Sequence, residues 1–158
     1  MAEKKRHWLT TSKIAILVTF HMCIPSALFA AATAVTKTQD LDFGKVVGGS
    51  GYSGTVTIAT SGTRSSSGSV IPMGTGFSPA RFSITGNVGE TYSLALPAGF
   101  TIVSGTSQMD VSAITYSIPV DGVIPAGGAL PFTVGATLTV NGTQPNSTYS
   151  GTLTISVK

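Results

Sequence analysis

The chain has 158 residues, only 9% of them charged, and a formal net charge of +3 at pH 7. Four of its nine basic residues lie within the first 13 positions, and from residue 33 onward five basic residues balance five acidic ones. Nucleic-acid binding requires clustered Lys and Arg to neutralise phosphates, so the composition excludes it.

The first predicted element is a secretory signal peptide over residues 1–32. Basic residues lead into an apolar, uncharged run at residues 14–29, and small residues follow. This order is typical of a signal peptide, and the run is shorter than the ~20 residues that span a bilayer. Small side chains permit cleavage before Thr33 or before Val35. We therefore expect an exported protein of the periplasm, cell surface or extracellular space, with no membrane span after signal removal.

Removal of the signal peptide takes away the side chains that most enzymes and metal sites use. The only cysteine, the only tryptophan and both histidines lie within it: Cys23, Trp8, His7 and His21. A nucleophilic serine then has no histidine base, and zinc has none of its preferred nitrogen or sulfur ligands. Asp40 and Asp42 are expected on an exposed face, which is not a glycosidase cleft. We predict no enzymatic activity, no metal and no cofactor.

Apolar residues alternate with Ser and Thr throughout the mature chain, and no helical period persists. The first predicted strand contains Leu41 and Phe43, the longest covers residues 132–140, and the last covers residues 149–157. Gly-, Pro- and Asn-Gly-containing turns separate about eight or nine short strands. The pattern predicts one all-β domain over residues 33–158, an antiparallel β-sandwich of immunoglobulin or pilin type.

One seven-residue stretch occurs twice. Residues 52–58 (YSGTVTI) and residues 149–155 (YSGTLTI) agree at six of seven positions. We expect two strands that enter the core in the same way, each with a glycine just before the pleat begins. The alternative is convergence on residues that are common in strands.

Residues 61–69 are rich in Ser and Gly, and Arg64 is their only charged residue. This composition predicts a long, mobile, polar loop. Loops on a rigid scaffold often carry binding residues, so Arg64, Ser65 and Ser66 are candidate contact residues. A solvated loop without a ligand is the alternative.

Six motifs occur in order along the mature chain and together point to a family. They are DLDFG at residues 40–44, GTRS at 62–65, ARFSITG at 80–86, TYS at 91–93 leading to Leu96-Pro97, VGATL at 134–138 and YSGTL at 149–153. With them the chain resembles the bacterial, exported domain-of-unknown-function family 4402. The resemblance implies a pilin-like β-sandwich, and some members accompany chaperone–usher assembly systems. It brings no catalytic residues.

Pilin-like subunits lack one strand, and an extension of a neighbour fills the groove by β-augmentation. The expected strand-pairing residues here are Leu153, Ile155, Val157 and Val35, and the expected partners are other copies, pilus subunits and a periplasmic chaperone. Only residues 33–39 precede the first predicted strand, and members of the family often have a longer extension here. An extension this short is also compatible with a terminal subunit or with a self-sufficient domain that donates no strand. The leading prediction is a non-catalytic structural or adhesive fimbrial subunit. The alternative is a self-contained envelope- or carbohydrate-binding module.

Overall fold

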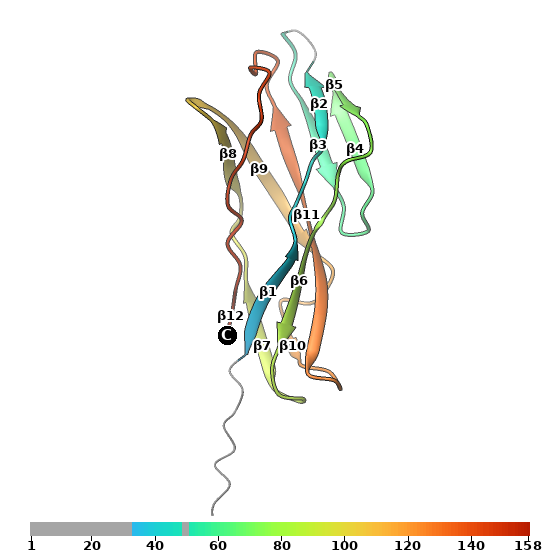
Figure 1. Cartoon of the computed structure of the whole chain (residues 1–158), viewed down its shortest axis with the longest axis vertical. Helices are drawn as coiled ribbons and strands as arrows, with labels where there is room; N and C mark the ends of the chain where they lie inside the picture. Colours follow the sequence, from blue (N-terminus) through green and yellow to red (C-terminus); the bar gives the residue numbers. More distant parts are fainter. Residues whose placement is uncertain (1–32, 49–50) are drawn as a thin grey trace, which may run out of the picture.

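The computed structural model describes residues 33–48 and 51–158 (Figure 1). The predicted signal peptide lies outside these residues. All twelve elements in the two described ranges are β-strands, and every ladder between them is antiparallel. Their bounds are β1 (Ala34–Gln39), β2 (Lys45–Gly48), β3 (Gly54–Ile58), β4 (Arg64–Gly68), β5 (Val70–Met73), β6 (Ala80–Thr85), β7 (Thr91–Ala95), β8 (Phe100–Ser104), β9 (Ser107–Tyr116), β10 (Asp121–Val123), β11 (Ala129–Val140) and β12 (Ser156–Val157).

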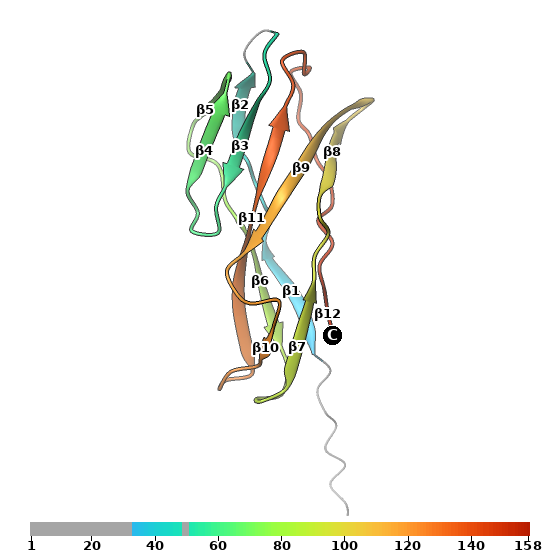
Figure 2. The same ribbon diagram turned by 180° about the vertical axis from the view of Figure 1, so that it is seen from behind.

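Strand β11 organises the larger sheet because it is long enough to pair with three other strands. Residues 129–134 pair with β6, residues 136–140 with β3, and residues 134–138 with β9. The sheet continues from β6 to β1, from β3 to β4 and from β9 to β8. A second sheet has the order β10-β7-β12, and β2 and β5 form a separate two-stranded ribbon. Figure 2 shows β11 running along most of the molecule and β9 crossing it near its middle.

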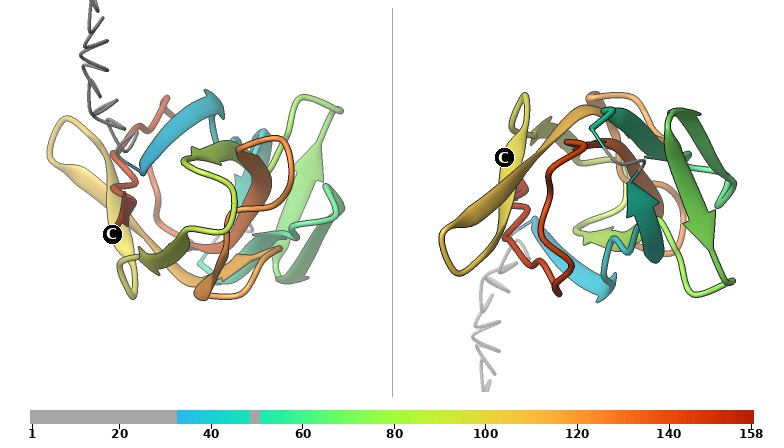
Figure 3. Two further views of the ribbon diagram at one scale, coloured as in Figure 1. Left: turned by 90° about the horizontal axis from the view of Figure 1, so that it is seen from below. Right: turned by 90° about the horizontal axis from the view of Figure 1, so that it is seen from above.

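The strands surround a common apolar interior (Figure 3). It contains two clusters of buried residues. The upper core consists of Phe43, Val56, Ile58, Val70, Met109, Val111, Ala136, Leu138 and Val140. The lower core consists of Ala80, Phe82, Ile84, Tyr92, Leu94, Ile124, Phe132 and Val134. The chain is therefore an antiparallel β-sandwich, and the predicted fold class is confirmed.

Period-two alternation explains why these strands form and which face they bury. In β11 the apolar residues at even positions from 132 to 140 are buried, while Thr133, Thr137 and Thr139 between them are only partly covered. Phe82 and Phe132 are opposite each other in the β6–β11 ladder, and their stacked ring centroids lie 5.5 Å apart. Such cross-strand pairs stabilise sheets, so one strand supplies much of both cores.

The first strand lies earlier in the chain than predicted. Strand β1 covers Ala34–Gln39, the stretch expected to precede the first strand, and it pairs with β6. Leu41 and Phe43 flank a single β-bridge at Asp42 and belong to no strand. Both side chains still reach the interior, so their apolar pattern correctly predicted burial but not pairing. Residues 34–39 therefore form the edge strand of the larger sheet in their own chain.

The Ser-rich stretch is not a loop, and this prediction was wrong. Arg64–Gly68 forms β4, which pairs along its whole length with β3. Serine hydroxyls participate in this pairing: the Thr55 and Ser67 hydroxyls lie 2.8 Å apart. The exposed position of β4 at the edge of the sheet explains its polar composition.

No helix among the described residues has the length and hydrophobicity needed to cross a bilayer.

Candidate assembly site

The last segment of the chain, residues 150–158, runs beside β8 and β7 on one side and β1 on the other (Figures 1 and 3). Ser150 exchanges two backbone hydrogen bonds with Val103 of β8, at 2.8 and 3.1 Å. Lys158 exchanges two with Ser93 of β7, at 2.8 and 3.0 Å. Within the described ranges, no ladder or backbone hydrogen bond joins this segment to β1. We call this boundary between β1 and residues 150–158 the seam.

Backbone groups of the last segment face the seam at alternate residues. Ser150 and Lys158 both direct their N–H and C=O groups towards β8 and β7. Because these groups alternate in direction along an extended chain, those of the odd-numbered residues Leu153, Ile155 and Val157 are directed towards β1. Strand β1 likewise has a ladder on only one of its edges, with β6. Two unpaired edges therefore face each other across the seam.

The structure brings the four predicted strand-pairing residues together. Val35, Leu153, Ile155 and Val157 are all partly buried and all pack against the lower core. Thr152 and the other even-numbered side chains of the last segment are exposed. The segment thus has the side-chain alternation of a strand, although only Ser156–Val157 has a strand's pairing.

The two copies of the repeated sequence place their glycines in the same way. A Cβ atom on Gly54 would lie 2.4 Å from the carbonyl oxygen of Ser67, and one on Gly151 would lie 2.4 Å from that of Thr101. At each site a neighbouring backbone approaches too closely for a side chain. The expectation of two strands that enter the core in the same way is confirmed for the first copy, which contains β3, and is wrong for the second, which forms no strand over residues 149–155.

The two copies differ in their neighbours. The first copy forms β3 and has a strand on both sides, β4 and β11. In the second copy only Ser150 is paired, through one bridge to Val103 of β8, and the opposite edge borders the seam. Since the two sequences are nearly identical, local propensity does not explain why only the first is a full strand. The difference lies in pairing: the first copy has ladders on both edges, whereas the described structure gives residues 149–155 a single bridge.

Arg64 is the first residue of β4, and its side chain points towards the interior rather than out from a solvent-facing contact loop. It is opposite Ile58 in the β3–β4 ladder, so it points to the same side of the sheet as the upper core. Its Nη1 donates to the Phe43 carbonyl at 3.2 Å, its Nη2 donates to the Gly74 carbonyl at 2.7 Å, and its guanidinium lies 4.3 Å from the centroid of the Phe77 ring. Arg64 therefore fastens β4 to the end of the β2–β5 ribbon.

Ser65 and Ser66 are exposed on the edge strand β4. They point to opposite sides of that strand because successive side chains alternate. Together with the inward direction of Arg64, this places the three predicted contact residues in different surroundings. The structure does not assemble them into one site.

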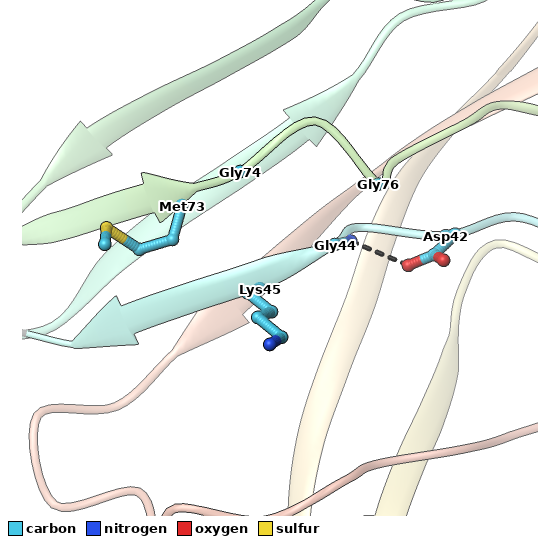
Figure 4. Close-up of a pocket in the computed structure, with 6 residues that line it drawn as sticks. All are labelled: Asp42, Gly44, Lys45, Met73, Gly74 and Gly76. Atoms are coloured by element: carbon cyan, nitrogen blue, oxygen red, sulfur yellow. Dashed lines mark hydrogen bonds between the residues drawn. The ribbon is translucent and has the colours of Figure 1, made fainter.

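A shallow hollow of about 420 Å³ lies beside the ribbon (Figure 4). Three glycines line it together with Asp42, Lys45 and Met73. The Asp42 carboxylate accepts a 2.7 Å hydrogen bond from the Gly44 N–H, which fixes the turn into β2. The lining contains no nucleophile with a neighbouring base, and in the part of the chain that the structure describes no three acidic, His or Cys residues cluster as metal ligands.

The protein is thus an antiparallel β-sandwich in which the edges of β1 and of residues 150–158 face each other without pairing in the described structure. The chain belongs to the family described as a domain of unknown function (DUF4402), which matches residues 33–158. The resemblance read from the sequence motifs is thus confirmed. No curated protein and no solved structure matched the chain. The family's description assigns no activity. The seam is the feature of the structure that bears most directly on function.

Proposed function

We propose that the protein is a non-catalytic, pilin-like surface subunit with a structural or adhesive role, which takes up a strand from another subunit at the seam. One observation carries the proposal. Residues 149–155 repeat the sequence of a fully paired strand, yet their edge towards β1 has no partner. A strand added there would supply the neighbour that β3 already has, once β1 and β12 move apart from the close approach that they make at their ends.

The topology defines the direction of such a strand. The chain of antiparallel ladders from β1 through β6, β11, β9 and β8 to Ser150 makes β1 and the last segment run in opposite directions. An inserted strand is therefore parallel to one and antiparallel to the other. We expect it to be antiparallel to the last segment and parallel to β1, because antiparallel pairing is slightly more stable per residue and is the arrangement of β3 with β11.

Strand uptake is favoured by two physical contributions. Each backbone hydrogen bond that forms contributes about 0.5–1.5 kcal/mol net, and alternate apolar side chains of the incoming strand would cover Val35, Leu153 and Ile155, which are now only partly buried. The five basic and five acidic residues of the mature chain cancel, so net charge does not oppose association of copies.

Export and partners are part of the same proposal. The predicted signal peptide would deliver the domain to the periplasm, the cell surface or the medium. There the strand would come from a pilus subunit, from another copy of the chain, or from a periplasmic chaperone before assembly. Strand addition of this kind uses main-chain hydrogen bonds for affinity and alternate side chains for specificity.

The first test is size-exclusion chromatography with light scattering on purified residues 33–158, with and without synthetic peptides. One peptide copies residues 33–45. A second copies residues 132–140 of β11, which includes the partner of the first repeat copy. We expect at least one of them to form a one-to-one complex and to raise the melting temperature, because it fills the seam.

The matched control is the second peptide with Thr137→Pro, since proline removes a backbone donor that strand pairing needs. This peptide should neither bind nor stabilise the domain. A monomer that ignores both unmodified peptides would mean that the sandwich is already complete. The self-contained envelope- or carbohydrate-binding module would then replace the pilin-like subunit, and glycan screening would follow.

A further inference from the structure

The outer face of the β2–β5 ribbon is apolar. In the ladder Val47 lies opposite Ile71, and Lys45 lies opposite Met73. Val47 is 52% exposed, Ile71 61% and Met73 49%. Because side chains alternate along strands and these pairs are two residues apart, all four point to the same side. We call Lys45, Val47, Ile71 and Met73 the ribbon face.

This face departs from the rule that the neighbouring strands follow. The corresponding outward positions of β3 and β4 carry hydroxyl residues, with Thr55 opposite Ser67 and Thr57 opposite Ser65. Hydroxyl side chains suit the solvated face of a sheet, whereas exposed large apolar side chains gathered in one place mark interaction surfaces. The ribbon face is thus the place where outward positions change from Ser and Thr to Val, Ile and Met.

The ribbon face is held in place from below. Val70 is buried in the upper core and Val46 packs against it. The Arg64 guanidinium donates to the carbonyls of Met73 and Gly74, at 3.4 and 2.7 Å, where β5 ends. A preformed surface loses little conformational freedom on binding. The ribbon therefore presents its apolar side chains as a fixed unit.

We propose that the ribbon face is a self-association surface, which binds the ribbon face of a second copy of this chain around a two-fold axis. Charge at its rim supports a second copy as the occupant. Asp42 and Lys45 line the same hollow beside Met73 (Figure 4), so the rim has one negative and one positive group. Two-fold symmetry makes such a patch self-complementary, with Lys45 of each copy placed to meet Asp42 of the other.

The size of the face sets the strength of the contact. A stable complex buries roughly 800 Å² on each partner, more than three partly exposed side chains provide. The contact is therefore weak and reversible, and it gives closed dimers at high protein concentration. It does not depend on the seam, because strand uptake there is head-to-tail and gives open chains of varying length.

The test is sedimentation velocity and equilibrium of residues 33–158 over a range of concentrations. The wild-type chain should show a reversible monomer–dimer equilibrium. The double variant Val47→Thr, Ile71→Ser restores the hydroxyl pattern of β3 and β4, and it should weaken dimerisation at least about tenfold, as the loss of two apolar contacts predicts. Lys45→Glu should also weaken it, and its effect should shrink as salt rises.

The matched control is Val123→Thr, which changes a 54% exposed apolar residue on β10 and should leave the dimer unchanged. Circular dichroism confirms that each variant is folded. A wild-type chain that stays monomeric at every concentration would overturn the proposal. So would a double variant that dimerises as well as the Val123→Thr control. Assemblies of mixed length that persist in the double variant would arise from strand uptake at the seam and not from contact between ribbon faces.

Discussion

Ile84→Ala is expected to lower the free energy of unfolding of residues 33–158 by about 3–4 kcal/mol, within the range measured for such changes. Ile84 is fully buried at 0% exposure in the lower core. It is paired with Val35 of β1 on one side and Leu130 of β11 on the other. Removal of its side chain leaves a cavity between two ladders, and the backbone hydrogen bonds of both neighbours prevent the site from collapsing.

Urea unfolding followed by circular dichroism measures this change. The control is Val88→Ala, four residues further along the chain, where the side chain is 64% exposed and removal should cost less than about 0.5 kcal/mol. If the Ile84 variant lost no more stability than the Val88 variant, the lower core would not be packed as described. If the slope of the free energy of unfolding against urea concentration is the same in all variants, only stability has changed and not the surface exposed on unfolding.

Gly135→Ala is expected to destabilise the domain by about 3 kcal/mol or more, at the upper end of what overpacking costs. A Cβ atom on Gly135 would lie 2.3 Å from the carbonyl oxygen of Ile58 and 3.0 Å from the backbone nitrogen of Thr60. These are backbone atoms of the chain leaving β3, and they cannot rotate away as a side chain would. The β3 and β11 strands would have to separate where both cover the upper core.

The same unfolding experiment on Gly76→Ala provides the comparison. A Cβ atom there meets nothing within 4 Å, and the residue does not have a positive φ, so this variant should be neutral or slightly stabilised. Equal behaviour of the two alanine variants would show that β11 does not pack against the end of β3 at this distance.

Sequence periodicity predicts the fold class well because burial itself produces the alternation. The even-numbered apolar residues of β11 and the Thr residues between them follow directly from one buried and one solvated face. Leu153, Ile155 and Val157 were found in the same way, since alternating apolar residues mark the inner face whether or not the strand is hydrogen-bonded, whereas Val35 was singled out only by the pilin-like resemblance. Pairing is a separate property, so the same pattern did not reveal that the second repeat copy lacks a neighbour.

Two of the strands that escaped prediction, β1 and β4, did so because their residues face mostly water. Residues 34–39 contain few large apolar side chains, and residues 64–68 contain none, yet both form edge strands through backbone hydrogen bonds to β6 and β3. Edge pairing requires no apolar pattern. The inward direction of Arg64 was likewise hidden, because it follows from its register opposite Ile58 and from carbonyl groups supplied by distant turns.

A β-bulge limits how far alternation can be followed along one strand. Met109, Val111 and Ala113 alternate in the sequence, and the first two are buried in the upper core. Ala113 is exposed and has a φ of 49°, where the β9–β11 register shifts by one residue. An inserted residue of this kind reverses the faces of all that follow, and it depends on the partner strand rather than on local sequence.

Amide hydrogen exchange tests the central claim of an open seam most directly, because the repeat supplies its own reference. Ile58 and Ile155 both follow Thr in nearly identical sequences, so their intrinsic exchange rates are close. We expect the Ile155 amide to exchange on the order of a hundredfold faster or more than that of Ile58, and to become protected when a strand peptide binds. Equal protection of the two amides in the free domain would contradict the open seam and with it the proposed assembly.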